Sequence, residues 1–295
     1  MRLGIMEMQM DRLISFESGA ESAVDQILNF DRRKLVMGLA QQGFPLIELG
    51  GDLGLFFRSA YKEKTIRQLA QIKDELDLDF TVHLPLWSVE PSTPLEPVRL
   101  GSTDAIMDIM DAVQPLEPEV YVLHATGALA AEFYRMQLPQ VARSLILKQF
   151  QGGAISSIRD ILEETGIPSR KLAIETIEFP LELTLEIADL LDLSVCLDTG
   201  HVLAGFSGAV EFEDALDACL PRLAEVHLHD APNFMKTGNL GYGQDHQALG
   251  TQDLDVKQLM TRLTKHDFKG PIIFELSVKE AQKSMAYLQH LGVSA

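Results

Sequence analysis

Histidine and acidic residues recur in small groups along this 295-residue chain, and each group ends a short apolar run. Imidazoles and carboxylates together suit zinc, manganese or cobalt, whereas calcium and magnesium prefer all-oxygen surroundings. A carboxylate buried in an apolar strand is also costly unless a partner such as a cation balances its charge. These groups therefore predict a metal site. Its candidate residues are His83 in FTVHLP, His124 in YVLHATG, Glu175 in LAIETIE, Asp198 and His201 in VCLDTGH, His227 and His229 in VHLHDA, and Glu275 in IIFELS.

The apolar runs that carry these residues have the length and composition of β-strands. Eight are predicted, at residues 2–6, 46–50, 80–84, 120–124, 172–176, 194–198, 224–228 and 272–276. Amphipathic stretches lie between them, among others at residues 31–43, 62–76, 102–113, 181–192 and 253–267. Such an alternation favours a (β/α)8 TIM barrel, an α/β fold, and we expect residues 1–295 to form one domain of this kind. Because the C-terminal ends of the strands in a barrel meet at one mouth, the distant candidates could share one site.

Two connections are longer than a barrel requires. Residues 86–102 contain several prolines and are predicted to form an ordered but irregular loop, since proline breaks helices. Residues 229–255 are glycine-rich and polar. Long loops at a barrel mouth usually enclose the substrate. No GxGxxG or GxxxxGK[ST] motif follows a predicted strand, which argues against a dinucleotide-binding fold and a P-loop.

The composition limits the partners. The formal net charge is −18, and because nucleic-acid binding draws on Lys and Arg contacts to phosphates, this charge argues against extended DNA or RNA. An anionic small substrate is still compatible with it. The two cysteines, Cys196 and Cys219, have no CxxC spacing and are expected in the core. No signal sequence or membrane-length apolar run is present, so we expect a cytoplasmic protein, and a homodimer is possible.

The ordered series HLP, VLHATG, IET, CLDTGH, VHLHDA, DHQALGTQDLD and FEL resembles the xylose isomerase-like superfamily. That superfamily includes sugar and sugar-phosphate isomerases and epimerases, and endonuclease IV-type phosphoesterases. The resemblance to the isomerase and epimerase branch implies one divalent metal, such as Mn, Zn or Co, held by Glu175, Asp198, His227 and Glu275. The two glutamates would also be the catalytic acid and base.

The resemblance to the endonuclease branch implies a three-zinc cluster, with four added ligands at His83, His124, His201 and His246. That branch has Asp-x-His where this chain has Gln244-Asp245-His246, so the acidic ligand is missing or displaced by one residue. The segments PLEPEVYVLHATG and SVCLDTGHVLAGF also look like cobamide-remodelling phosphodiesterases.

These branches imply different chemistry. For isomerisation or epimerisation of a small sugar or sugar phosphate, which we take as the leading function, one glutamate removes a proton next to a metal-bound carbonyl and the other returns it. The alternative is zinc-dependent hydrolysis of a phosphoester in a small molecule, in which two or more metals activate water. A non-catalytic barrel that binds a metal or ligand is the third possibility.

Other residues have supporting roles or ordinary explanations. His201 could ligate a metal, orient Asp198 or contact substrate, and His229 and Asp230 are expected to support the ligands by hydrogen bonding. Trp87 could form a wall for a sugar ring or simply pack, and Lys236 could grip a phosphate or lie in solvent. Glu7 and Glu48 could face the mouth, but neither is assigned to catalysis. His266 and His290 are assigned to solvated helix surfaces.

Overall fold

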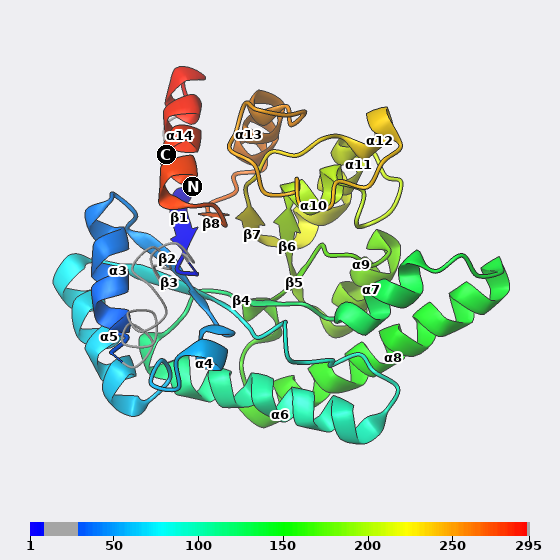
Figure 1. The fold of residues 1–295 in the computed structure, drawn as a ribbon, viewed down its shortest axis with the longest axis horizontal. Coiled ribbons are helices and arrows are strands. Elements are labelled where there is room, and N and C mark those ends of the chain that lie inside the picture. Colours follow the sequence, from blue (N-terminus) through cyan, green and yellow to red (C-terminus); the bar gives the residue numbers. More distant parts are fainter. Residues whose placement is uncertain (9–28, 294–295) are drawn as a thin grey trace, which may run out of the picture.

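The eight predicted strands form a closed parallel barrel in the computed structural model, which describes residues 1–8 and 29–293 (Figure 1). The strands follow one another around the barrel in chain order, and β8 pairs with β1 to close it. Each predicted run agrees with its strand to within two residues at either end. The strands are β1 (Arg2–Met6), β2 (Leu46–Gly50), β3 (Asp79–His83), β4 (Tyr121–Leu123), β5 (Leu172–Glu175), β6 (Ser194–Asp198), β7 (Leu223–His227) and β8 (Pro271–Phe274).

Helices surround the barrel and connect its strands (Figure 1). The described α-helices are α3 (Arg32–Gln41), α4 (Leu53–Phe56), α5 (Glu63–Leu76), α6 (Glu96–Val113), α7 (Ala128–Arg135), α8 (Gln140–Thr165), α9 (Leu181–Leu191), α10 (Thr199–Leu203), α11 (Phe212–Cys219), α12 (Phe234–Thr237), α13 (Val256–Lys265) and α14 (Val278–His290). The predicted TIM barrel is confirmed. None of the helices in the described part of the chain combines the length and apolar character that a membrane crossing requires.

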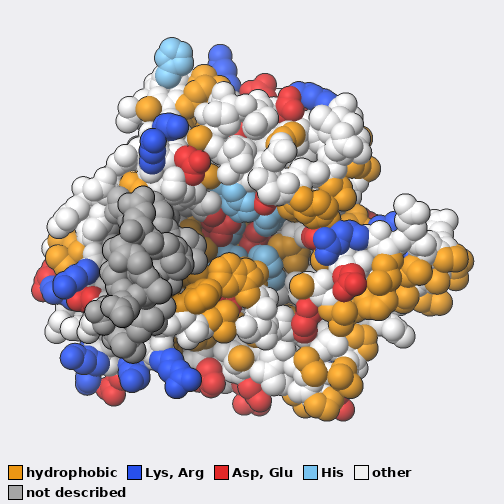
Figure 2. Space-filling model, viewed as in Figure 1, with side chains coloured by type: hydrophobic (Ala, Val, Ile, Leu, Met, Phe, Trp, Pro, Cys, Tyr) orange, Lys and Arg blue, Asp and Glu red, His pale blue; other side chains and the backbone are white. Residues whose placement is uncertain are grey.

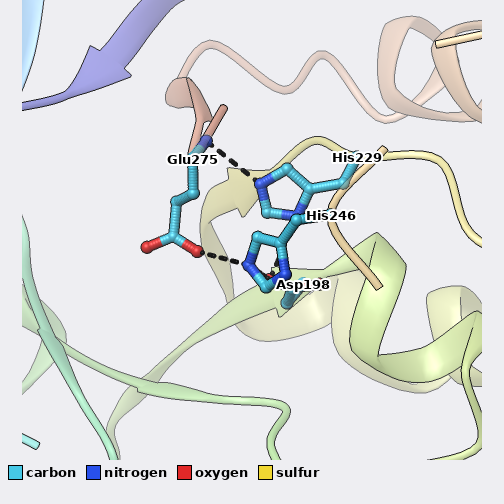
Figure 3. Close-up of side chains that lie close together, drawn as sticks. All are labelled: Asp198, His229, His246 and Glu275. Carbon is cyan, nitrogen blue, oxygen red and sulfur yellow. Dashed lines mark hydrogen bonds and ion pairs between the residues drawn. The ribbon is translucent and has the colours of Figure 1, made fainter. Parts of the chain in front are cut away.

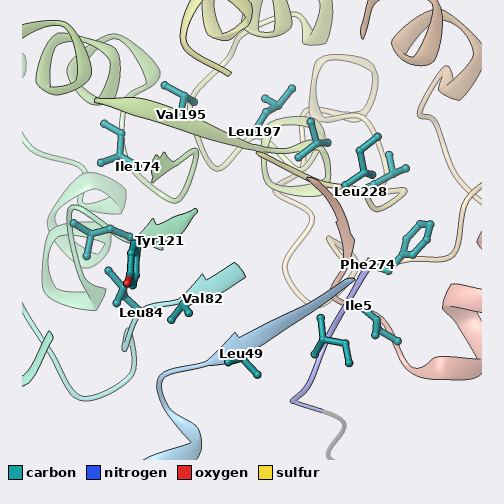
Figure 4. Close-up of a cluster of buried hydrophobic side chains, with 14 of the residues drawn as sticks. Ile5, Leu49, Val82, Leu84, Tyr121, Ile174, Val195, Leu197, Leu228 and Phe274 are labelled. Atoms are coloured by element: carbon teal, nitrogen blue, oxygen red, sulfur yellow. The ribbon is translucent and has the colours of Figure 1, made fainter. Parts of the chain in front are cut away.

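Strand side chains alternate between the helix layer and the barrel interior. One set, which includes Ile5, Leu49 and Leu197, belongs to the large buried core between strands and helices (Figure 4). The interior instead contains small apolar residues such as Ala173 and Cys196, which form a separate buried cluster. Both cysteines are buried, as predicted. The alternation leaves the interior positions at the C-terminal ends of the strands for polar residues.

The proline-rich segment after β3 is less irregular than predicted. α6 begins at Glu96, with a proline in its first turn, so the prediction of an irregular loop over residues 86–102 is wrong beyond residue 95. Proline is tolerated there because the first N–H groups of a helix have no intrahelical acceptor. The irregular part that remains brings Trp87 to the mouth of the barrel.

The glycine-rich segment after β7 is closed into a loop at its base. Asp230 and Gln247 exchange two backbone hydrogen bonds of 2.9 Å, which form an isolated antiparallel bridge. The carboxylate of Asp230 also accepts backbone N–H groups from Ala231, Thr251, Gln252 and Leu254 at 2.8–3.0 Å. This loop returns to the mouth, where His246 lines the cavity.

Candidate metal centre

Histidine and acidic side chains gather at the bottom of a hollow at the barrel mouth (Figure 2). The cavity has a volume of about 660 Å³. Six of the predicted ligand residues line it: His83, His124, Glu175, His201, His246 and Glu275. Asp198 and His227 lie beneath them and are fully buried.

The centre of the cluster is formed by Glu175, Asp198 and His227. Their atoms Oε1, Oδ2 and Nδ1 lie within 4.8 Å of one another, and none forms a well-directed hydrogen bond with a described residue. The nearest imidazole nitrogens outside this group are His201 Nδ1, 3.2 Å from Glu175 Oε1, and His229 Nδ1, 3.4 Å from Asp198 Oδ2. His227 Nδ1 is 3.5 Å from Glu175 Oε1, 3.9 Å from Asp198 Oδ2 and 3.6 Å from Glu275 Oε2. Buried polar atoms without partners are costly. A divalent cation between them would satisfy all three atoms, so these residues fit the metal that the sequence predicts.

Two further carboxylates orient His227 from below. Its Nε2 lies 3.3 Å from Glu48 Oε1 and 3.8 Å from Glu225 Oε1, while Thr81 donates a 3.2 Å hydrogen bond to Glu225. With the ring proton on Nε2, directed at Glu48, the lone pair of Nδ1 faces the cluster. Burial, reinforced by the charge of Glu48, raises the pKa of Glu225 to about 8. Glu225 was not among the residues predicted from sequence, although the two-residue strand period places it on the same side as His227.

A second ligand set joins His83 and His124 to Glu175. Both Nε2 atoms contact Glu175 Oε2, at 3.1 and 3.0 Å. His83 Nδ1 donates to the carbonyl of Leu84 at 2.9 Å, which leaves the Nε2 lone pair free to bind a metal. Since Oε1 of Glu175 faces Asp198 and His227, this carboxylate belongs to two neighbouring sets.

The third set contains His201, Asp245 and His246, whose candidate ligand atoms also lie within 4.8 Å of one another. His246 Nδ1 is 2.6 Å from Asp245 Oδ2, and His246 Nε2 is 3.1 Å from Glu275 Oε2. Asp245 thus places a carboxylate beside His246, one position after Gln244. Gly200 makes room for it, because a Cβ at that position would lie 1.8 Å from the carbonyl oxygen of Asp245.

His229 supports the cluster but is not suited to be a ligand (Figure 3). Its Nε2 accepts the backbone N–H of Glu275 at 3.1 Å, so in the neutral ring Nδ1 carries the proton. That nitrogen points to Asp198 Oδ2 at 3.4 Å. Burial lowers the pKa of His229, which favours this neutral form. The supporting role of His229 stays a prediction, and Asp230 bonds instead to the backbone of the loop that carries His246.

The electrostatics of the cluster favour bound cations. Burial opposes charge on the imidazoles, but the nearby carboxylates outweigh it and raise the pKa of His83 to about 10. They likewise raise the pKa of His201 to about 9 and that of His246 to about 11. Burial also opposes charge on Glu175 and Glu275, yet the adjacent histidines hold both pKa values well below the ordinary range. The carboxylates thus remain ionised and attract either protons or metal ions.

The remaining candidates lie outside the cluster. Trp87 lines the cavity, but Lys236 is not among its lining residues, and its amino group pairs with Asp253 at 2.8 Å. Glu7 is buried in an ion pair with Arg32. The two histidines assigned to helix surfaces, His266 and His290, are exposed at the ends of α13 and α14, as predicted.

The strands form a closed eight-stranded parallel barrel, and the polar cluster lies at its C-terminal mouth. This is the face where TIM-barrel enzymes have their active sites. The family description "Xylose isomerase-like TIM barrel" matches residues 38–291, and the chain belongs to this family. This agrees with the resemblance inferred from the sequence.

Known proteins are similar to this chain at low sequence identity. The chain is 24% identical over 240 residues to the Methanocaldococcus jannaschii protein MJ1311, covering 77% of this chain and 74% of that protein. It is similar in structure to a D-tagatose 3-epimerase-like protein, with a TM-score of 0.71, 19% identity and coverage of 99% and 97% of the two chains. It is also similar in structure to the 3-keto-D-glucoside 4-epimerase YcjR of E. coli, with a TM-score of 0.69, 16% identity and coverage of 98% of this chain and 99% of that one.

Proposed function

We propose that the protein is a metal-dependent hydrolase of a phosphoester in a small molecule, with more than one divalent ion at the barrel mouth. The number of convergent ligand-type side chains carries this proposal. Five imidazoles and four carboxylates meet in the cluster, whereas one zinc ion takes about four ligands. They are His83, His124, His201, His227, His246, Glu175, Asp198, Asp245 and Glu275.

These residues form three neighbouring sets of side chains, each of which could hold a metal ion. When bound, two or more ions would supply hydroxide at neutral pH and clamp the phosphate oxygens. Glu175 joins the central set to that of His83 and His124 through its two oxygens. Glu275 joins the central set to that of His246. Shared carboxylates hold such sets close together, as in-line displacement at a phosphate requires.

The surroundings of the cluster favour a small substrate. The ligand groups lie at the bottom of a cavity of about 660 Å³, within the range of small-molecule sites. The net charge of −18 opposes the approach of a polynucleotide.

Metal content and phosphodiesterase activity test the proposal together. We expect two or three zinc ions per chain by elemental analysis of protein purified without chelators, and hydrolysis of bis(p-nitrophenyl) phosphate by that protein. Glu175→Gln should abolish the activity while the protein stays folded. One ion per chain with no hydrolysis would reject the proposal.

Isomerisation or epimerisation of a small sugar is the second candidate. Glu175 and Glu275 both approach His227 Nδ1, at 3.5 and 3.6 Å, so both carboxylates lie close to the central position. The solved structures with similar folds include proteins named as sugar epimerases. A bound metal would polarise the carbonyl, and Glu275 would move the proton. This function ranks second because His83 and His124 both occupy Oε2 of Glu175. A single Mn or Co per chain, with solvent hydrogen entering a ketose, would favour it.

A further inference from the structure

An aromatic rim lies at the entrance to the metal-centre cavity. Trp87, the only tryptophan of the chain, lines this cavity with 57% of its surface exposed. Phe56 is 38% exposed, and its ring meets that of Trp87 edge to face, with centroids 5.9 Å apart. Leu55 on the same short helix is also exposed. Figure 2 shows hydrophobic side chains beside the central hollow. Exposed apolar groups that gather at a cavity mark a binding surface.

The backbone beneath Trp87 is held by a buried carboxylate. Asp52 Oδ2 accepts the N–H of Leu86 at 2.9 Å and that of Trp87 at 3.3 Å. Gly51 lets the two loops approach, because a Cβ at this position would lie 2.5 Å from the Pro85 ring. The loops after β2 and β3 are thus fastened to each other, and the backbone that carries the exposed indole is held in position before any ligand arrives.

The cavity offers cations only at its base. No Lys or Arg occurs among the described residues that line it, and its walls above the cluster include Met6, Leu86 and Leu276. An anionic group on the substrate would therefore find positive partners only at the metal cluster. Among the described residues that line the cavity, a second anionic group near the rim would find no positive partner, so the rest of the substrate is expected to be uncharged.

We propose that Trp87 and Phe56 form a subsite for a flat, uncharged, unsaturated ring, and that the substrate is a phosphodiester carrying such a ring. The phosphodiester half of this inference rests on the proposed function. An exposed indole supplies a large flat face, and stacking of a ring on an aromatic side chain contributes about five- to 150-fold in binding. A phosphodiester carries the one charge that the cluster can meet, and its remainder can be neutral.

A matched pair of esters tests the subsite. The methyl esters of adenosine 5′-phosphate and of ribose 5-phosphate have the same phosphodiester and differ at C1 of the ribose, which carries adenine in the first and a hydroxyl group in the second. With the metal-loaded protein, stopped-flow mixing should show quenching of Trp87 fluorescence by the adenosine ester before turnover, and less by the ribose ester. We expect kcat/KM to be about tenfold or more higher for the adenosine ester. Trp87→Ala should reduce this ratio to near one, whereas Trp87→Phe should keep most of it. Leu145→Ala, at an exposed position on α8, is the control and should leave the ratio unchanged.

Equal kcat/KM values for the two esters, or a Trp87→Ala variant that keeps the preference, would overturn the subsite and leave the proposed function intact. If neither ester is hydrolysed, the proposed function fails. The quenching of Trp87 fluorescence by the two esters then tests the subsite alone. Quenching by the adenosine ester at concentrations at least tenfold lower than by the ribose ester would support it. No such difference would overturn it.

Discussion

At the scale of single residues, the position of one proton on His227 decides whether the central site can form. Nδ1 can face the cluster with a lone pair only if the ring proton is on Nε2, and Glu48 is the acceptor that keeps it there, at 3.3 Å. Partners of this kind fix the tautomer of metal-binding histidines and typically affect metal affinity by about 10- to 100-fold. Glu48 therefore acts through His227 rather than on the substrate.

Glu48→Leu should weaken zinc binding by about 10- to 100-fold, because it removes the acceptor for the Nε2 proton. Glu48→Gln keeps an oxygen in the same place and should restore most of the affinity. Competition with a chromophoric chelator measures the affinity, and circular dichroism checks the fold. Equal zinc affinities for the two variants would show that Glu48 does not set the tautomer.

Under the proposed function, Asp245 would supply the carboxylate of the third ligand set, beside His201 and His246. Asp245→Ala should lower the zinc content by about one ion per chain, because it removes the carboxylate beside His201 and His246. Gln244→Ala, at the position where the related Asp-x-His motif has its acid, should keep the full content. Elemental analysis after gel filtration measures both. A loss of metal in Gln244→Ala but not in Asp245→Ala would contradict the assignment.

At the scale of elements, the strands and the residues that end them were predictable from sequence. Glu175, Asp198 and His227 each end a short apolar run, and parallel strands in a barrel bring such ends together. Asp245 was not predictable in the same way. Its place depends on how residues 229–255 fold back, and the bridge that closes them joins Asp230 to Gln247 across many residues.

The helices show the same distinction. α8 was not among the stretches identified by periodicity, since paired glycines interrupt its apolar pattern. Gly153 has a structural reason, because a Cβ there would lie 2.2 Å from the carbonyl oxygen of Ser92. Such close approaches between distant segments leave no local signal, and only the packed structure reveals them.

The loop after β7 provides a prediction at this scale. Asp230→Ala should reduce the free energy of unfolding by about 3 kcal/mol, because it leaves backbone N–H groups without their charged acceptor. It should also lower the zinc content, since Asp245 and His246 lie on the loop that it holds. Urea unfolding and elemental analysis measure the two effects. Asp230→Asn, which keeps the side-chain shape, should lie between wild type and alanine. A full zinc content in Asp230→Ala would show that the loop keeps its position without this side chain.

At the scale of the whole molecule, acidic residues dominate the net charge of the chain and also gather in the cluster at the barrel mouth. The chain carries a net charge of −18, and four of its carboxylates converge at the barrel mouth. Without metal, protonated imidazoles balance these carboxylates, and His83, His201 and His246 have pKa values raised to about 10, 9 and 11. Bound metal would replace those protons, so protons and metal ions compete for one set of groups.

This competition makes the stability of the metal-free protein depend on pH in a defined direction. A histidine whose pKa is raised by folding stabilises the native state fully below its unfolded pKa of about 6.5, and this stabilisation is lost as pH rises through the folded value. Between the unfolded and folded pKa values, each imidazole that keeps its proton in the native state lowers the free energy of unfolding by about 1.4 kcal/mol for every pH unit of increase. With coupling between the three groups, we expect the free energy of unfolding of chelator-treated protein to fall by about 3 kcal/mol between pH 6.5 and 8.5.

Urea unfolding at several pH values measures this dependence. His246→Gln should make it shallower, whereas His266→Gln, at the exposed end of α13, should leave it unchanged. The extra free energy of unfolding that zinc gives over the metal-free protein should increase as pH rises. The reason is that zinc binding releases protons and so strengthens at higher pH. Metal-free stability that is constant or rises from pH 6.5 to 8.5 would mean that the imidazoles of the cluster are neutral before metal binds.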